Sequence, residues 1–235
     1  MVTGGGTGIG AAIAVALADE GCHVVVAGRR IKPLEAVVRS YEGQGKLACH
    51  EVDVADRDRV GELFAWVDRE LGPIDILVNS AGINVARRAM AELDPDDWDR
   101  LLRVNATGAY LCMREVLPDM RSRGDGLIIN ISSIAGKRAG LLGGVAYDAS
   151  KFAMSALGIA VGLEDGPHGV RVTNIYPGEV NTPILEDRPQ PVSAEHKARI
   201  LQPDDVAAAA LMVACLPPRA HVPELVIKPT YQDYV

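Results

Sequence analysis

A tyrosine and a lysine four residues apart, Tyr147 and Lys151, are the residues in this chain whose types and spacing most directly suggest chemistry. On a helix, positions i and i+4 share one face and lie about 6 Å apart. A cation held there favours the ionised phenol, so we expect it to lower the pKa of Tyr147 from its ordinary value near ~10. Such a phenol can donate and accept a proton near neutral pH. The spacing by itself also fits a surface pair on any amphipathic helix.

The elements that must position this pair alternate between strands and helices. Short, β-branched apolar runs predict buried strands at 23–28, 46–52, 74–79, 126–132, 170–176 and 224–228. Helix-length segments lie between them at 8–20, 31–43, 56–71, 96–122, 147–165 and 203–215. Alternation along the whole chain predicts an α/β fold with a doubly wound, mainly parallel sheet of about seven strands and helices on both faces.

The 235 residues are interpreted as a single domain, 1–235, because no change in composition marks a second one. The first strand is the exception to the pattern. Only residues 1–3 precede a turn at Gly4, whereas buried strands usually run about five or six residues. We therefore expect a first strand that has been clipped at its start.

Composition limits the classes of partner. The net charge of -7 argues against nucleic acid or an anionic membrane as the main partner. No apolar run approaches the roughly 20 residues of a membrane span, and no signal peptide is visible. The cysteines are scattered, which fits a reducing cytosol and predicts a cytoplasmic protein without a metal site. They are Cys22, Cys49, Cys112 and Cys215.

A glycine-rich segment, "TGGGTGIG" at 3–10, joins the short first strand to the helix expected at 8–20. Glycine lets the backbone turn tightly and approach a pyrophosphate, which then lies on free N–H groups at the helix N-terminus. The spacing of Gly4, Gly8 and Gly10 differs from the general GxGxxG fingerprint. The segment predicts a dinucleotide site, with a flexible loop as the alternative.

Two arginines stand where dinucleotide sites usually carry an acid. That acid, about 20 residues after the glycine turn, binds the ribose 2′-hydroxyl. Here the chain has Gly28, Arg29 and Arg30 instead. Guanidinium groups suit the extra 2′-phosphate of NADP. We therefore expect NADP(H) to be preferred, with NAD(H) as the second option; the alternative is two solvated arginines that open a helix.

Seven motifs in order make the chain resemble the short-chain dehydrogenases/reductases over essentially its full length. They are "TGGGTGIG" (3–10), "VDV" (52–54), "NSAG" (79–82, where the family has NNAG), "VNATG" (104–108), "INISS" (129–133), "YDASK" (147–151) and "YPGEVNTP" (176–183). The resemblance implies a Rossmann fold. It also displaces the surface-pair interpretation of Tyr147 and Lys151.

The resemblance implies catalytic roles for four residues. Tyr147 would donate a proton to a carbonyl oxygen in reduction and accept it in oxidation. Lys151 would hold the nicotinamide ribose, and Ser133 would hydrogen-bond the substrate oxygen as charge develops. Asn105 would hold a water that links Lys151 to solvent. Ser133 lies 14 residues before Tyr147, one more than is common in the family, so Ser132 is the less favoured alternative.

The resemblance also implies the residues that contact the cofactor. They come from the glycine turn, the ends of the following strands and the segment after "IYP". They are Gly4, Gly6, Thr7, Gly8, Ile9, Gly10, Arg29, Arg30, Asp53, Val54, Asn79, Ala81, Gly82, Tyr147, Lys151, Pro177, Gly178, Val180 and Thr182.

The segment 183–200 occupies the place of the family's substrate lid. Its three prolines and six charged residues are poor material for a hydrophobic clamp. Lys137 and Arg138 follow Ser133, where solvent-facing side chains are favoured and contact with an anionic substrate is the alternative. Glu179 would lie near the nicotinamide, with a role in the backbone turn favoured over one in substrate binding.

These features predict an NADP(H)-dependent oxidoreductase that interconverts a carbonyl and an alcohol on a small molecule. The alternative is a non-catalytic NADP-binding sensor or scaffold of the same fold. In the family, helices such as those expected at 96–122 and 147–165 pack across a twofold axis, so we expect a homodimer or homotetramer. The C-terminal "PELVIKPTYQDYV" departs from the family's usual ending, which weakens the transfer of its tetramer.

Overall fold

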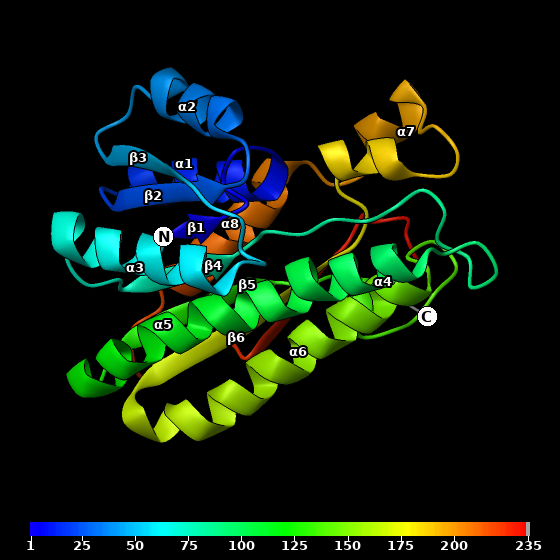
Figure 1. The fold of residues 1–235 in the computed structure, drawn as a ribbon. Helices are drawn as coiled ribbons and strands as arrows, with labels where there is room; N and C mark the ends of the chain where they lie inside the picture. The colour runs from blue at the N-terminus through cyan, green and yellow to red at the C-terminus, as the bar shows by residue number, and fades with distance from the viewer. Residues whose placement is uncertain (234–235) are drawn as a thin grey trace.

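A computed structural model describes residues 1–233, and it has one sheet of seven parallel strands in the order β3-β2-β1-β4-β5-β6-β7 (Figure 1). The strands are β1 (Val2–Thr3), β2 (His23–Gly28), β3 (Lys46–Glu51), β4 (Ile76–Asn79), β5 (Gly126–Ile131), β6 (Val170–Pro177) and β7 (Glu224–Ile227). The chain reverses its direction of winding between β3 and β4, so the ends of β1 and β4 flank a topological switch point. Ligands bind at such points in open α/β sheets. The predicted fold class is confirmed.

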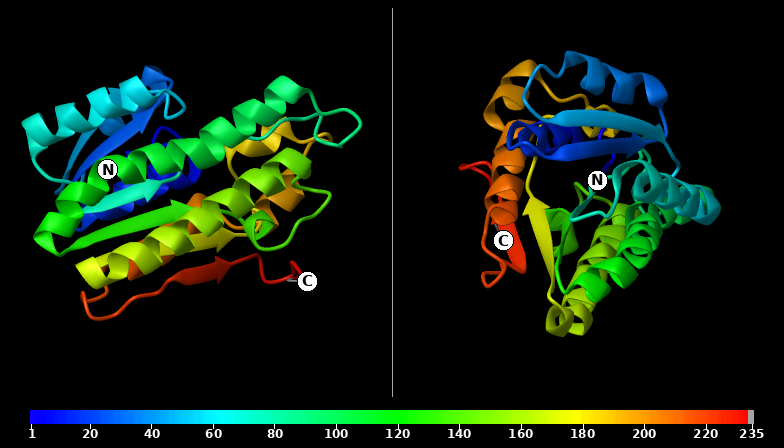
Figure 2. Two further views of the ribbon diagram at one scale, coloured as in Figure 1. Left: turned by 60° about the horizontal axis from the view of Figure 1, so that its bottom comes forward. Right: turned by 90° about the vertical axis from the view of Figure 1, so that its left-hand side faces the viewer.

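Helices cover both faces of the sheet (Figure 2). One face carries α1 (Gly8–Asp19), α2 (Ile31–Ser40) and α8 (Pro203–Ala214), and the other carries α3 (Arg57–Leu71), α5 (Gly108–Arg123) and α6 (Val145–Asp165). Buried side chains accordingly form one large cluster on each face. Within residues 1–233, no helix has both the length and the apolar character needed to cross a membrane.

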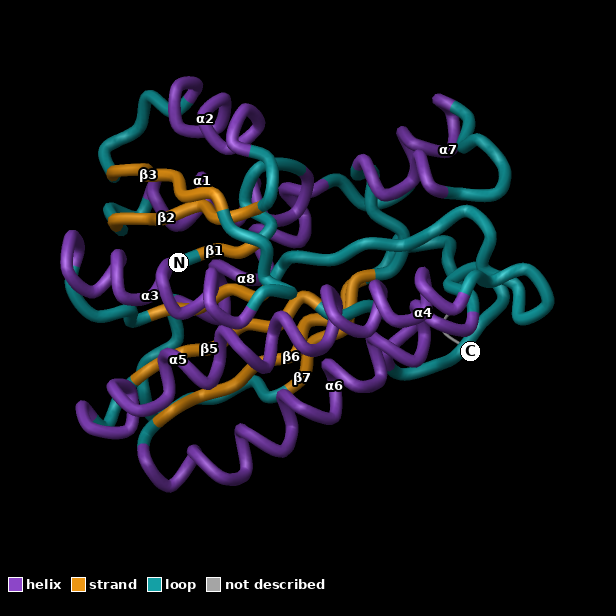
Figure 3. Tube along the Cα trace, viewed as in Figure 1, coloured by secondary structure: helices purple, strands orange, loops and turns teal. Residues whose placement is uncertain are grey.

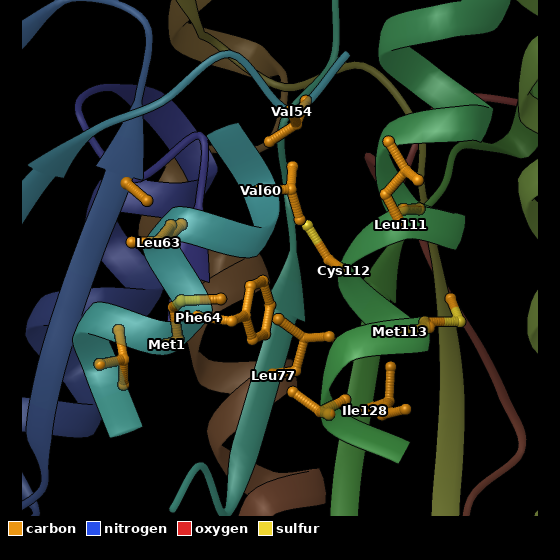
Figure 4. Packing of buried hydrophobic residues seen from close by; sticks show 14 of the residues in the cluster. Met1, Val54, Val60, Leu63, Phe64, Leu77, Leu111, Cys112, Met113 and Ile128 are labelled. Carbon is orange, nitrogen blue, oxygen red and sulfur yellow. The ribbon is translucent and has the colours of Figure 1, made fainter. Parts of the chain in front are cut away.

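The cluster under α3 and α5 shows how an aliphatic chain builds its core (Figure 4). Leu63 of α3, Leu77 of β4 and Ile128 of β5 are fully buried there. Burying one such side chain stabilises the fold by about 1.5–3 kcal/mol. Cys112 of α5 is also fully buried, and burial raises the pKa of its thiol to about 12. The thiol therefore acts as a small apolar group in this core.

The first strand is short and central. Val2 pairs with Val26 of β2 on one side and with Val78 of β4 on the other. The Met1 ammonium donates to the Ile76 carbonyl oxygen at 2.7 Å. Burial of this group lowers its pKa to about 6. A strand of two residues is thus held between two longer neighbours by ladder hydrogen bonds on both edges.

The helix expected at 96–122 is interrupted. α4 (Pro95–Leu102) begins after the cap residue Asp94, and a π-helical turn (Arg103–Thr107) joins it to α5. The extra residue in such a turn changes which side chains face inward, and Asn105 in this turn is fully buried. Inside the segment 183–200, a short helix that the sequence did not predict, α7 (Ala194–Arg199), begins after the cap residue Ser193. Figure 3 shows α7 and α4 at the end of the sheet where the loops gather.

Candidate active site

A cleft of about 790 Å³ runs along the carboxyl ends of the strands. It brings together most of the residues that the sequence predicted. Those that line it are Gly4, Gly6, Thr7, Gly8, Ile9, Gly10, Arg29, Arg30, Val54, Ala81, Gly82, Ser133, Tyr147, Lys151, Pro177, Gly178, Val180 and Thr182. Asp53, Asn79 and Asn105 are not part of its wall. One end of the cleft is therefore the glycine turn, and the other contains Tyr147.

The glycine turn has no room for side chains. Gly4 and Gly8 have φ values of 67° and 55°, which L-residues with a Cβ adopt only at a cost. A Cβ on Gly4 would lie 2.7 Å from the Ala81 nitrogen, and one on Gly8 would lie 3.0 Å from Cγ2 of Thr182. The side chain of Thr7 does not cap α1, and the first turn of that helix carries no acid. Free N–H groups beside bare backbone fit the pyrophosphate of a dinucleotide.

The end of β2 forms the wall next to this turn. Gly28 is followed by Arg29 and Arg30, whose side chains are exposed at the rim of the cleft. Neither arginine forms an ion pair with another residue of the described part of the chain. Both guanidinium groups are thus available to a phosphate at this end.

Two predicted cofactor residues lie behind the wall. The Asp53 carboxylate accepts a hydrogen bond from the Ala55 N–H at 3.0 Å, which fixes the turn after β3. The Asn79 amide donates to Asn130 at 3.0 Å, and Asn130 donates to Asn174 at 2.9 Å. These buried amides link β4, β5 and β6 beneath the site. The structure therefore gives both side chains contacts within the protein rather than a place in the cleft wall.

Ser133 and Tyr147 meet at the other end of the cleft. Ser133 lies close enough to the Tyr147 phenol to act on its pKa, and the Ser133 hydroxyl accepts from the Ala135 N–H at 3.1 Å. Ser132 instead lies 3.0 Å from the Ser155 hydroxyl, in the interior. The structure thus places Ser133 near the phenol, while Ser132 contacts α6 through Ser155 and the Lys151 carbonyl.

The pKa of Tyr147 is shifted in the direction opposite to our expectation. Burial raises it, because the phenolate loses its water, and the Asp148 carboxylate adds to the rise. The interaction with Ser133 and the positive charge of Arg88 act to lower it. Lys151 Nζ lies 5.7 Å from the centroid of the tyrosine ring and donates to the Ile131 carbonyl oxygen at 2.9 Å. The i, i+4 spacing is present, but desolvation outweighs the effect of the charges.

Lys151 and Asn105 are buried behind Gly82. Burial lowers the pKa of Lys151 to about 8. A Cβ on Gly82 would lie 3.5 Å from Lys151 Nζ and 3.6 Å from Asn105 Oδ1, so both polar groups lie next to Gly82. Asn105 holds the backbone of Ile83, accepting from its N–H at 2.8 Å and donating to its carbonyl at 3.0 Å. It also donates to the Ser150 hydroxyl at 2.9 Å. Asn105 therefore ties the π-helical turn to the strand end and to α6.

The substrate side contains residues that sequence reasoning either missed or assigned differently. The Glu179 carboxylate accepts from Arg188 at 3.1 Å and lies 2.7 Å from His196 Nε2, so it anchors the lid segment. These hydrogen bonds lower the pKa of Glu179, although its partial burial acts to raise it. Lys137 pairs with Glu224 at 2.8 Å and is absent from the cleft wall, which argues against the alternative that it contacts an anionic substrate.

Arg88 was missed altogether. It is buried in the wall of the cleft, and its guanidinium contacts three separate segments. No motif marks it, because "ARRAM" (86–90) resembles an ordinary solvated pair of arginines. Within residues 1–233, no group of three His, Cys, Asp or Glu side chains is placed to hold a metal ion.

Known proteins with similar sequences and folds identify the family to which this cleft belongs. A family profile described as short chain dehydrogenase matches residues 1–192. The chain belongs to the short-chain dehydrogenase family. This short-chain dehydrogenase is 37% identical over 203 residues to the 3beta-hydroxysteroid dehydrogenase of Mediterraneibacter gnavus, a match that covers 86% of this chain and 71% of that one. It is thus an oxidoreductase of the short-chain type.

Two further relatives define the extent of the likeness. The short-chain dehydrogenase is 37% identical to glycine betaine reductase ATRR of Emericella nidulans over 97% of its own length, but it spans only 18% of that much longer protein. Its fold superimposes on the closed form of a serine dehydrogenase complexed with NADP+ with a TM-score of 0.90. In that comparison, sequence identity is 30%, and 99% of this chain and 95% of that chain are covered.

Proposed function

We propose that the protein is an NADP(H)-dependent oxidoreductase that interconverts a carbonyl and an alcohol on a small molecule. The observation that carries the proposal is the position of Tyr147, next to Ser133, in the same cleft as the bare glycine turn. One end can hold a dinucleotide, and the other can transfer a proton. The presence of all four of Asn105, Ser133, Tyr147 and Lys151 favours this function over a non-catalytic sensor or scaffold, which has no need of the set.

The chain's own groups carry the proton transfer. When bound, the nicotinamide cofactor supplies or accepts the hydride. In reduction, the Tyr147 phenol donates its proton to the carbonyl oxygen, and Ser133 donates a hydrogen bond to that oxygen as negative charge develops on it. In oxidation, Tyr147 accepts the proton. Lys151 holds the ribose next to the nicotinamide, and Asn105 keeps the π-helical turn beside it in place.

We also propose a preference for NADP(H), supported by Arg29 and Arg30 at the rim next to the glycine turn. A 2′-phosphate there pairs with guanidinium through charge-assisted hydrogen bonds. Solved neighbours of this chain carry the same cofactor class: a serine dehydrogenase with NADP+ and an actinorhodin polyketide ketoreductase with NADPH.

We infer a homodimer that forms through the outer faces of α5 and α6. Large apolar side chains are exposed on them: Tyr110 on α5, and Phe152, Ile159 and Leu163 on α6. Apolar residues on adjacent helices are typical of a surface that a second copy covers. A molecular mass by light scattering that stays at the monomer value at every concentration would contradict this inference.

The experiment that tests the proposed function is NADPH consumption by the whole protein with a panel of ketones and aldehydes. We expect turnover with at least one member, and slower turnover when NADH replaces NADPH. Saturable NADPH binding without turnover on any member would instead support the sensor or scaffold.

A further inference from the structure

Arg88 is buried at the substrate end of the cleft and is 8% exposed. Its Nε donates to the Val85 carbonyl at 2.8 Å, its Nη1 to that of Leu142 at 2.7 Å, and its Nη2 to that of Asp187 at 2.6 Å. The acceptors belong to three segments that lie far apart along the chain. One side chain therefore joins the loop after β4, the loop before α6 and the lid.

Neighbouring contacts reinforce the same junction. The Arg88 carbonyl oxygen accepts from the Val145 N–H at the start of α6, the helix that carries Tyr147. Asn84 donates to the Gly143 carbonyl at 3.1 Å. Gly144 packs so closely that a Cβ there would lie 2.6 Å from Cβ of Arg88. The loop before α6 is therefore seated on the segment 84–88, with the guanidinium at the centre of the contact.

Neutral groups hold the guanidinium of Arg88. All three of its acceptors are backbone carbonyls, and no ion pair within 4 Å joins it to another described residue. Burial and the charge of Arg188 lower the pKa of Arg88, while the Asp187 carboxylate acts to raise it. The groups around Tyr147 are the Ser133 hydroxyl, the Asp148 carboxylate, the Lys151 ammonium and Arg88. The positive charge of Arg88 favours the phenolate of Tyr147.

We propose that Arg88 is a positioning residue for the reaction: its guanidinium holds the loop before α6 and the lid together as the substrate wall, and its charge acts on Tyr147 from the start of α6. This role rests on the proposed function, because it concerns the same cleft. A lysine at this position keeps the charge but cannot make the three forked hydrogen bonds. A methionine keeps most of the side-chain volume but loses both the positive charge and the three hydrogen bonds.

The test uses Arg88→Met, Arg88→Lys and, as a matched control, Arg87→Met, which changes the exposed arginine next to it in sequence. Hydrogen exchange is measured over 139–144 and 183–188. We expect exchange in both segments to be about tenfold faster in the two Arg88 variants, since each lost hydrogen bond is worth roughly 1 kcal/mol. The Arg87 variant should match the unmodified protein.

The second readout is the ultraviolet titration of Tyr147, taken as the difference between each protein and its Tyr147→Phe counterpart. Phenolate should form at higher pH in Arg88→Met, whereas Arg88→Lys should keep the position of the unmodified protein. A purely structural role would not separate the two variants in this way. Neither readout needs a substrate, so a protein that turns over no carbonyl would refute the proposed function and still leave this role tested.

Unchanged exchange in both segments, or an unchanged Tyr147 titration in Arg88→Met, would overturn the proposal. If Arg88→Met shows no cooperative thermal unfolding, the proposal is tested by hydrogen exchange in Arg88→Lys alone. Normal protection of 139–144 and 183–188 in Arg88→Lys would then show that the forked hydrogen bonds hold neither segment.

Discussion

The two ends of the cleft are built in different ways. The cofactor end consists of bare backbone, where Gly4 and Gly8 turn at positive φ and leave no space for a Cβ. The substrate end consists of loops tied together by side chains: Arg88 binds residues 54 and 99 positions away in sequence, and Glu179 binds residues 9 and 17 positions away. The shape of the cofactor end follows from glycines close together in the sequence. The shape of the substrate end depends on contacts between different segments of the chain.

This difference predicts which function of the cleft a substitution at each end should affect. Substitutions at the cofactor end should weaken nucleotide binding directly, since the backbone itself is the binding surface. Substitutions at the substrate end should leave nucleotide binding intact and alter turnover or substrate affinity. The following predictions test that division.

Substitution of Lys151, which lies where the two ends meet, should give the largest effect, a change in how the free energy of unfolding depends on pH. Burial lowers the pKa of Lys151 in the folded protein to about 8, from an ordinary value of 10.5. Between these values the unfolded chain binds more protons, so this group's contribution to stability rises with pH across that window. Below pH 8 the full cost of burying the charge applies, about 3 kcal/mol at ~1.36 kcal/mol per pH unit.

Lys151→Met removes this dependence. The free energy of unfolding is measured by urea denaturation at pH 7 and at pH 10. Its increase from pH 7 to pH 10 should be smaller in the variant than in the unmodified protein, by up to about 3 kcal/mol. Comparing the two proteins cancels the other groups that titrate in this range. An identical pH dependence would mean that the lysine is not desolvated.

The cofactor end should also set the choice of nucleotide. In Gly28→Asp/Arg29→Ala, a carboxylate would repel a 2′-phosphate and accept a hydrogen bond from a free 2′-hydroxyl. We expect the unmodified protein to prefer NADPH by about ten- to a hundredfold in kcat/KM, and the double variant to prefer NADH. If the unmodified protein already favours NADH, Arg29 and Arg30 are surface residues without this role.

Gly8→Ala tests the bare backbone itself. An L-residue at a positive φ costs roughly 1–2 kcal/mol, and the new Cβ would meet Thr182. NADPH affinity, measured by calorimetry, should fall by about tenfold. Gly61→Ala is the matched control, because Gly61 lies in α3 with nothing near its Cβ position. Equal NADPH affinities in the two variants would remove the argument for a steric cradle.

Glu179→Gln should give the smallest effect, confined to the substrate end. The amide keeps the shape of Glu179 but loses the charge that holds Arg188 and His196. We expect KM for the best carbonyl substrate to rise about two- to fivefold, the scale of partly exposed ion pairs. Glu195→Gln, an exposed change on α7, should have no effect. A matching loss of NADPH affinity in Glu179→Gln would show that the two ends are not separable.

The same difference explains what the sequence could predict. Strands such as β2 are continuous apolar runs, and glycines at fixed spacing report the shape of a turn, so the fold and the cofactor end could be predicted. Arg88 could not, because its partners Leu142 and Asp187 lie 54 and 99 residues away, beyond any local pattern. The raised pKa of Tyr147 was also missed, because i, i+4 spacing gives the position of a charge but not the degree of burial.

The most direct test of the account is to measure NADPH affinity and turnover side by side in Tyr147→Phe. This change keeps the ring and removes the proton that can be transferred. The account predicts that NADPH consumption with a carbonyl substrate falls by at least about a hundredfold, the usual scale for a positioned acid or base, while the dissociation constant of NADPH stays the same. Near-normal turnover in Tyr147→Phe would contradict the account.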